Sequence, residues 1–436
     1  MTDRFNELIP ELDFDLPESP ISIVDHRELL EVSNAGNSIL SPNQSTSFVI
    51  SASDRVLDAQ KTWFSLEMKT DHLNATPKSI TDIFKSCEVL FNGQRVELID
   101  DLGALEVVYR RLLFSNSYRK YDNQTALVFD DDRLNTDDAA PVGGELDANN
   151  EATDTQKGKK VRLMANGYVS FAFRLNSLGV LSTNKFVPLL YTNGIELRFQ
   201  LHNEKQGMSS IVGAPTNSNY SVKNFKMHYE TISLTKQASS ALAEAHRAGQ
   251  LQLHLHSWNH SLKTSTGSFS HDIPSNKNIC SELLHCQRRA TDLSDEKKDS
   301  HQYMGYNARN FQSAQMIYSD NQRIPNRPIR GATEAYMFLK NAAPNAGNPH
   351  VDNVSYYDFS GDGDLVANVD KQKSGFMVWP LEVMSSYDLN GVSTKNGRSL
   401  VIDYSSTSTT PAQNDFFLGY EMVVNLESDG SVSVEE

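Results

Sequence analysis

The sequence is poor in cysteine and in long apolar runs. It contains three cysteines in 436 residues, too few for the disulfide framework of a small secreted domain. We therefore expect Cys87, Cys280 and Cys286 to be reduced thiols in a protein that folds in a reducing compartment. The mean hydropathy is −0.47, and no apolar run is long enough to predict a transmembrane helix.

The sequence also lacks a leader and an excess of positive charge. It begins Met1-Thr2-Asp3-Arg4-Phe5 and stays acidic, so we expect no signal peptide. Lys and Arg number 40 against 55 Asp and Glu, which gives a net charge of −15. Because an acidic surface repels phosphate, we expect no direct sequence-specific binding of nucleic acid. The sequence contains no Walker loop, no Gly-x-Ser-x-Gly elbow and no dinucleotide fingerprint.

What is present is a succession of short alternating stretches separated by Asn, Gly, Asp, Ser and Pro. The residues Cys87–Leu98 predict a hairpin, because Asn92-Gly93 suits a type I′ turn in which both central residues need positive φ. Other predicted strands are Ser47–Ile50, Thr62–Met68, Tyr168–Leu175, Ile195–Phe199 and Phe225–Leu234. This spacing is typical of an all-β sandwich or barrel.

Helical signals are few. Leu102–Phe114 carries apolar residues at helical spacing, and the Ala-rich segment Ala238–Ala248 ends at Gly249, which suits a short helix between two halves. Residues 130–160 are too polar to form core and predict a surface insertion. Residues 1–40 predict an extended arm.

The two halves resemble each other in sequence. At a shift of 228 residues, Gln94-Arg95 aligns with Gln322-Arg323, and Gly103-Ala104 aligns with Gly331-Ala332. At a shift of 203, Asn193-Gly194 aligns with Asn396-Gly397. The second half is thus 25 residues shorter between the two matches, and the insertion at 130–160 explains the gap. Ordered matches of this kind predict a tandem duplication.

A duplicated acidic sandwich with this order of elements resembles the double jelly-roll major capsid proteins of the adenovirus and tectivirus type. The residues that carry the resemblance are Cys87–Leu98, Leu102–Phe114, Phe186–Leu190, Asn193–Leu197, Tyr220–Leu234 and Ala238–Ala248 in the first half, then Gly375–Pro380, Asn396–Leu400 and Phe416–Leu426 in the second. The resemblance implies an all-β fold of two tandem jelly-roll β-sandwiches with a few short helices.

The resemblance and the repeat together divide the chain. We expect an N-terminal arm at 1–40, a first jelly roll at 41–237 with the insertion at 130–160, and a helical linker at 238–250. A second jelly roll follows at 251–428, with a C-terminal tail at 429–436.

The function implied is that of a major capsid protein. Three chains, each with two similar sandwiches, form a homotrimer of pseudo-hexagonal outline that tiles an icosahedral shell. The arm is expected beneath the shell, and the insertion at 130–160 and the stretch 341–363 on its outside. Expected partners are other copies of the chain, minor capsid or penton proteins, and an inner membrane beneath the shell. The expected location is the virion, after synthesis inside the host.

Candidate chemistry is sparse, and we expect no catalytic, cofactor-binding or metal-binding residues and no cofactor. His254, His256 and His260 could share a strand face and reach one metal, but a polar strand face explains them as well. Asp358–Asp364 resembles the first half of a calcium loop, but Val369 stands where a bidentate Glu is needed. Asp130-Asp131-Asp132 is expected to be a solvated acidic run.

Two other functions fit an all-β chain. One is a two-domain carbohydrate-binding or adhesion module, for which a signal peptide would be expected. The other is a β-sandwich glycosidase, which needs two carboxylates across a cleft that sequence does not place.

Overall fold

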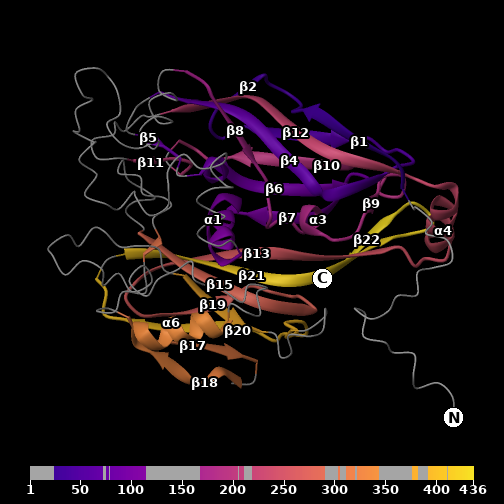
Figure 1. The fold of residues 1–436 in the computed structure, drawn as a ribbon. Coiled ribbons are helices and arrows are strands. Elements are labelled where there is room, and N and C mark those ends of the chain that lie inside the picture. The colour runs from indigo at the N-terminus through magenta and orange to yellow at the C-terminus, as the bar shows by residue number, and fades with distance from the viewer. Residues whose placement is uncertain are drawn as a thin grey trace, which may run out of the picture.

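The computed structural model shows a predominantly β protein made of two jelly rolls that follow one another in the chain (Figure 1). It describes residues 24–71, 75–77, 79–113, 167–204, 206–210, 219–289, 303–304, 311–319, 322–342, 376–381, 391–409 and 411–436. The expected insertion at 130–160, the candidate calcium loop at 358–364 and residues 1–23 of the expected arm lie outside these ranges.

The first jelly roll consists of two facing four-strand sheets with short additions. One sheet has the order β1-β12-β4-β8, with strands Val24–Ser33, Tyr220–Leu234, Val56–Thr70 and Val169–Phe173. The short strands β2 (Ile39–Leu40) and β9 (Val187–Pro188) pair with β12 and β4. The other sheet has the order β3-β10-β6-β7, with strands Ser45–Ile50, Ile195–Leu201, Phe84–Phe91 and Gln94–Asp100. A separate pair joins β5 (Ala75–Thr76) to β11 (Ser209–Ser210).

The second jelly roll repeats this plan. Its first sheet contains β13 (Gln252–Thr266), β21 (Pro411–Leu426) and β15 (Ile279–Arg289), with β19 (Phe376–Pro380) and β16 (Tyr303–Met304) on β15 and β22 (Val432–Glu435) on β21. Its second sheet has the order β14-β20-β17-β18, with strands Phe269–Ile273, Leu400–Ser406, Phe311–Tyr318 and Gln322–Arg330.

The two halves therefore correspond strand by strand. In chain order, β1, β3, β4, β6, β7, β8, β10 and β12 match β13, β14, β15, β17, β18, β19, β20 and β21, and both sets form the same two sheet orders. A 12-residue helix follows the matching hairpin in each half: α1 (Leu102–Leu113) and α6 (Gly331–Ala342). The repeated chain path inferred from the 228-residue shift is confirmed, since β7 and β18 begin at Gln94 and Gln322.

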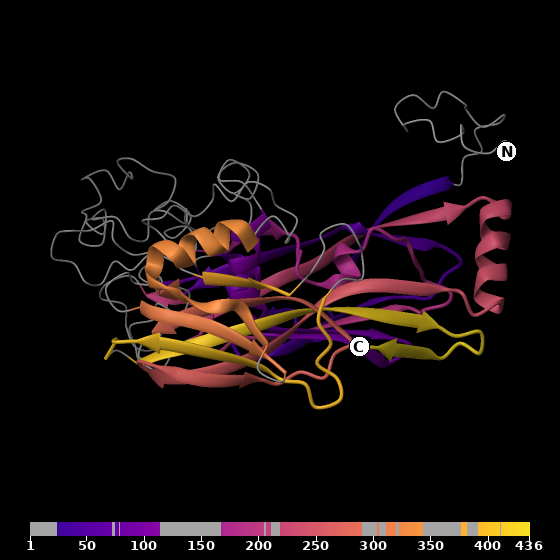
Figure 2. The same ribbon diagram turned by 90° about the horizontal axis from the view of Figure 1, so that it is seen from below.

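Local chemistry explains the turns and the linker. Asn92 and Gly93 have φ of 50° and 74°, as a type I′ hairpin turn requires. The helix α4 (Lys236–Arg247) joins the two jelly rolls and lies at one end of the molecule (Figure 2). Thr235 caps its first turn, and Gly249, with φ of 67°, ends it by donating to the His246 carbonyl. Short helices η2 (Ile80–Ile83) and α3 (Gly179–Ser182) complete the first half.

Two expected boundaries differ from the structure. The prediction of an arm is wrong for residues 24–40, since β1 pairs along its length with β12, and β2 adds to the same strand. The prediction of a C-terminal tail is wrong for Val432–Glu435, which pair with β21 as β22. Both segments were missed because β1 is largely exposed and carries no regular apolar alternation, while β22 alternates over only four residues.

Candidate functional site between the two jelly rolls

The two jelly rolls meet along β13, which packs against β7 and α3 of the first half (Figure 1). Trp258 of β13 is fully buried there and lies edge-on to Tyr109 of α1, with ring centroids 5.7 Å apart. Burial raises the pKa of the Tyr109 hydroxyl well above its usual range, so it stays neutral. An aromatic pair with one ring from each half fixes the lateral position of the two sandwiches.

A glycine allows the backbones of the two halves to touch. A Cβ on Gly179, the first residue of α3, would lie 2.2 Å from the His256 carbonyl oxygen of β13. No side chain fits in that space, so only glycine permits this approach. Within the second half, Gly419 of β21 makes room for two side chains, because a Cβ there would lie 2.9 Å from His256 Cε1 and 3.0 Å from Glu282 Oε1.

His256 lies between two carboxylates of its own sheet. Its Nδ1 lies 2.9 Å from Glu421 Oε1, and its Nε2 lies 3.2 Å from Glu282 Oε1. Burial disfavours the charged imidazole, but the two carboxylates outweigh burial and raise the pKa of His256 to about 10. Burial also opposes ionisation of Glu282, yet the imidazolium of His256 lowers the pKa of that carboxyl. The three groups form a charged triad at the junction.

Glu97 of β7 lies close to this triad and is itself buried. Its Oε1 accepts a hydrogen bond from the Gly179 amide at 2.8 Å, and its Oε2 accepts one from Val180 at 3.3 Å. The carboxylate therefore satisfies the first amides of α3, which have no partner within the helix. Burial raises the pKa of Glu97 despite these hydrogen bonds and the nearby charge of His256. Glu97 thus holds α3 in the position from which its backbone meets β13.

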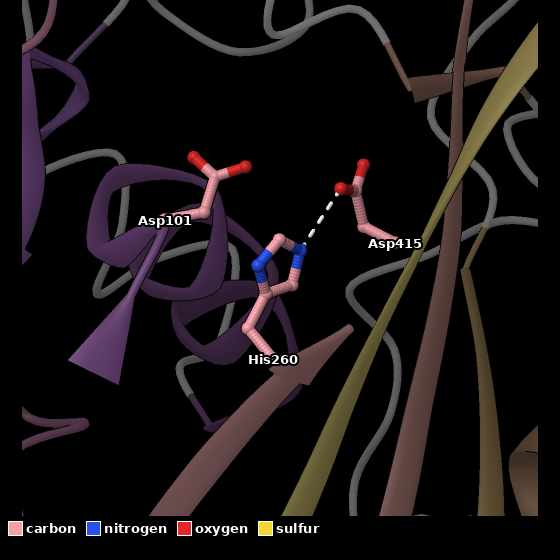
Figure 3. A group of neighbouring side chains, drawn as sticks. All are labelled: Asp101, His260 and Asp415. Atoms are coloured by element: carbon pink, nitrogen blue, oxygen red, sulfur yellow. Dashed lines mark hydrogen bonds and ion pairs between the residues drawn. The ribbon is translucent and has the colours of Figure 1, made fainter. Parts of the chain in front are cut away.

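A second polar group spans the same junction. Asp101, at the turn from β7 into α1, lies near His260 of β13 and Asp415 of β21, and the two carboxylates flank the His260 ring (Figure 3). His260 Nε2 lies 3.0 Å from Asp415 Oδ1. Asp101 has φ of 53°, a conformation that Asp tolerates better than most residues, and its carbonyl accepts from the Leu105 amide at the start of α1. The turn thereby aims the Asp101 carboxylate at the second half.

From the sequence, His254, His256 and His260 were considered as one cluster, but in the structure they do not face one common site. His254 is exposed, whereas His256 and His260 are partly buried and face different carboxylates. Sequence reasoning did not single out Asp101, Asp415, Glu97, Glu282 or Glu421, each of which comes from a strand or turn far away in the chain. Asp415 lies two residues before Phe417, the residue opposite His260 in the register of β13 and β21, and this register is visible only in the structure.

The three cysteines form no disulfide, and all are buried. Burial raises the pKa of Cys87 well above its usual range and that of Cys280 to about 11, so both are unreactive neutral thiols. Within the described part of the chain, none of the helices has the length and apolar character needed to cross a membrane.

Comparison with known proteins adds evidence at the level of fold. No family model matches the sequence, and no curated protein matches it. A chain of the PBCV-1 virus capsid matches with a TM-score of 0.59 and 12% identity, over 96% of this chain and 99% of that one. A chain of the Sputnik virophage matches with a TM-score of 0.58 and 10% identity, over 98% and 92%.

The mavirus major capsid protein matches with a TM-score of 0.53 and 10% identity, over 97% of this chain and 94% of that one. At sequence identities of 10–12%, these proteins share the path of the chain with this protein, and they share it over nearly the whole length of each chain. The chain therefore has the double jelly-roll fold of viral major capsid proteins, as the sequence resemblance implied.

Proposed function

We propose that this protein is a major capsid protein, the structural subunit of an icosahedral virus shell. The observation that supports it best is the strand-by-strand correspondence of the two jelly rolls, combined with end-to-end similarity to viral capsid chains. A chain with two similar sandwiches presents two similar sides, so three chains around one axis present six and can pack in a hexagonal lattice. This role requires no catalytic residue.

Several finer features belong to the same proposal. The domains are the first jelly roll, the linker α4 and the second jelly roll, with β1 added to the first sandwich and β22 to the second. Partners are other copies of the chain, then minor capsid or penton proteins, above an inner membrane. Location in the virion follows, and the three buried thiols support folding in a reducing compartment of the host.

Apolar side chains left exposed on the single chain are candidates for contacts between subunits. Among the residues that the structure describes, these are Leu29, Ile39, Val49, Phe186, Leu190, Leu262 and Met337. Leu29 is 64% exposed and lies on β1, a strand at the edge of its sheet. An edge strand with an apolar side chain is suited to packing against another subunit.

The test is the mass of the purified full-length chain by size-exclusion chromatography with light scattering. We expect about 146 kDa, the mass of three 48.7 kDa chains, or shell-sized particles visible by electron microscopy. A monomer that binds glycans would instead support the carbohydrate-binding or adhesion module, and hydrolysis of a glycan would support the glycosidase. Leu29→Glu should lower the trimer fraction, while Lys236→Glu on the exposed linker helix should not.

A further inference from the structure

We propose that Asp101, His260 and Asp415 form a binding site for a divalent transition-metal ion, with zinc as the best-suited ion, that ties the two jelly rolls together. One ligand comes from the first jelly roll and two from the second. The inference concerns the interior of one chain and does not depend on the proposed capsid function.

The geometry is close to that of a metal site. Each of the three residues offers a ligand atom, and these atoms lie within 4.8 Å of one another. Two ligands of one tetrahedral zinc ion, each about 2.0–2.2 Å from the ion, lie about 3.4 Å apart. Shortening the longest separation by at most about 1.4 Å therefore brings the three atoms into coordination distance. Figure 3 shows the two carboxylates on either side of the imidazole.

Neighbouring side chains hold the two carboxylates in place. His202, which is buried, has its Nε2 3.3 Å from Asp101 Oδ1. Gln413 donates from Nε2 to Asp415 Oδ1 at 2.9 Å. The ring of His260 stacks on Phe417, with centroids 4.7 Å apart. Outer hydrogen bonds to carboxylate ligands and a fixed imidazole are what orient the ligands of protein metal sites.

Charge favours occupancy by a cation. Asp415 is fully buried, and the side chains of His260 and Asp101 are only 9% and 12% exposed. The two carboxylates attract a cation, and burial strengthens that attraction because little water screens it. The imidazole selects among cations, because calcium and magnesium prefer oxygen ligands only, whereas zinc accepts nitrogen and oxygen together.

A metal ion bound at this site would stabilise the docked arrangement of the two jelly rolls. Ligands from both jelly rolls meet only when β7 packs against β13 and the Asp101 turn lies beside His260 and Asp415. An ion that binds this state and not the separated state stabilises it by mass action. The ion would thereby fix the relative orientation of the two sandwiches.

The test uses the full-length protein after treatment with a chelator. Titration with zinc, followed by calorimetry and by elemental analysis after dialysis, is expected to show one tightly held equivalent per chain. Calcium at the same concentration should not compete. Asp101→Asn and His260→Gln should each lose that equivalent, whereas His254→Gln, an exposed histidine of the same strand, should keep it.

A spectroscopic measurement on the unaltered protein tests the site even if the variants fail to fold. Cobalt in place of zinc should give the visible absorption of a low-symmetry site with mixed nitrogen and oxygen ligands, and zinc should displace it. The proposal is overturned if the unaltered protein retains no stoichiometric zinc. It is also overturned if folded Asp101→Asn binds zinc as tightly as the unaltered protein.

Discussion

The two jelly rolls share a chain path but differ in what fills them. The first has a core of six phenylalanines, and Phe225 at its centre lies 4.7–6.4 Å from the rings of the others, which are Phe48, Phe64, Phe84, Phe173 and Phe199. The second buries His285, Gln287, Asn414 and Asp415 among its strands. The second half also buries aromatic side chains such as Trp379, Phe416 and Phe417, so the same strand order accommodates a buried polar network beside an apolar core.

The buried polar residues of the second jelly roll are tolerated because they form hydrogen bonds with one another and with the backbone. Asn414 accepts from Gln287 Nε2 at 2.8 Å, lies 3.2 Å from His285 Nε2 and donates to the Lys263 carbonyl at 3.0 Å. The His285 ring also stacks on Phe416, with centroids 4.4 Å apart. A buried polar network is tolerated when each group has a partner, and it then becomes sensitive to substitution and to pH.

The largest expected effect is at the aromatic core of the first half. Phe225→Ala should lower the free energy of unfolding by about 3–5 kcal/mol, because it removes the ring that contacts the other five and leaves a dry cavity. Phe416→Ala in the second half should cost less, since polar neighbours such as His285 allow water to enter. Chemical denaturation of both variants measures the difference. An equal or larger loss for Phe416→Ala would contradict the contrast between the two cores.

Acid should destabilise the second half through His285. Burial lowers the pKa of His285 to about 4, so the folded state keeps it neutral, while the unfolded chain takes up a proton near pH 6.5. Stability is therefore lost as pH falls from 6.5 towards 4, by about 3 kcal/mol from this group at 1.36 kcal/mol per pKa unit.

The free energy of unfolding is measured against pH for the unaltered chain and for His285→Leu. This variant replaces the imidazole with a side chain that cannot titrate but still packs against Phe416. The part of the acid dependence due to His285 should disappear in this variant. His254→Leu, at an exposed position, serves as the control and should leave the profile unchanged. Identical profiles for all three proteins would show that His285 is not the acid-sensitive group.

A third expected effect concerns the seam where the halves meet. Gly179→Ala places a Cβ 2.2 Å from the His256 carbonyl oxygen, so α3 must move away from β13 at a cost of about 1–3 kcal/mol. Gly207→Ala is the matched control, because its Cβ would first meet atoms at 3.3 Å. Calorimetry should show one transition for the control and a broadened or split one for Gly179→Ala. Equal melting curves would mean that the seam does not couple the two jelly rolls.

The smallest expected effect is at the linker. His246 of α4 stacks on Tyr191 of the first half at 4.0 Å and has its Nε2 2.8 Å from the Glu427 carbonyl oxygen of the second. His246→Ala removes one hydrogen bond and one stacking contact, so a loss of about 1 kcal/mol is expected in denaturant titrations. Lys236→Ala on the same exposed helix should be neutral, and a loss as large as that of His246→Ala would argue against a bridging role.

Much of the fold could be predicted because it is local in the chain. The Asn92-Gly93 turn, the period of two in Ile195–Phe199 and the Gly249 helix end each follow from neighbouring residues. The edge strand β1 could not, because hydrogen bonds to β12 hold it and its own side chains are mostly exposed. The partners of the histidines could not be predicted for the same reason. The spacing of His256 and His260 on β13 suggested one cluster, but their partners Glu421 and Asp415 lie on another strand.

The residues alone allowed us to infer two tandem sandwiches and a resemblance to viral capsid chains, since turn residues and alternating side chains act over a few positions and occur twice. Only the tertiary structure decided which charges meet. Asp101, His260 and Asp415 are far apart in the chain, and they converge because β13 pairs with β21 while the turn after β7 docks against both. Side-chain electrostatics depends on distance in space, which the order of residues does not contain.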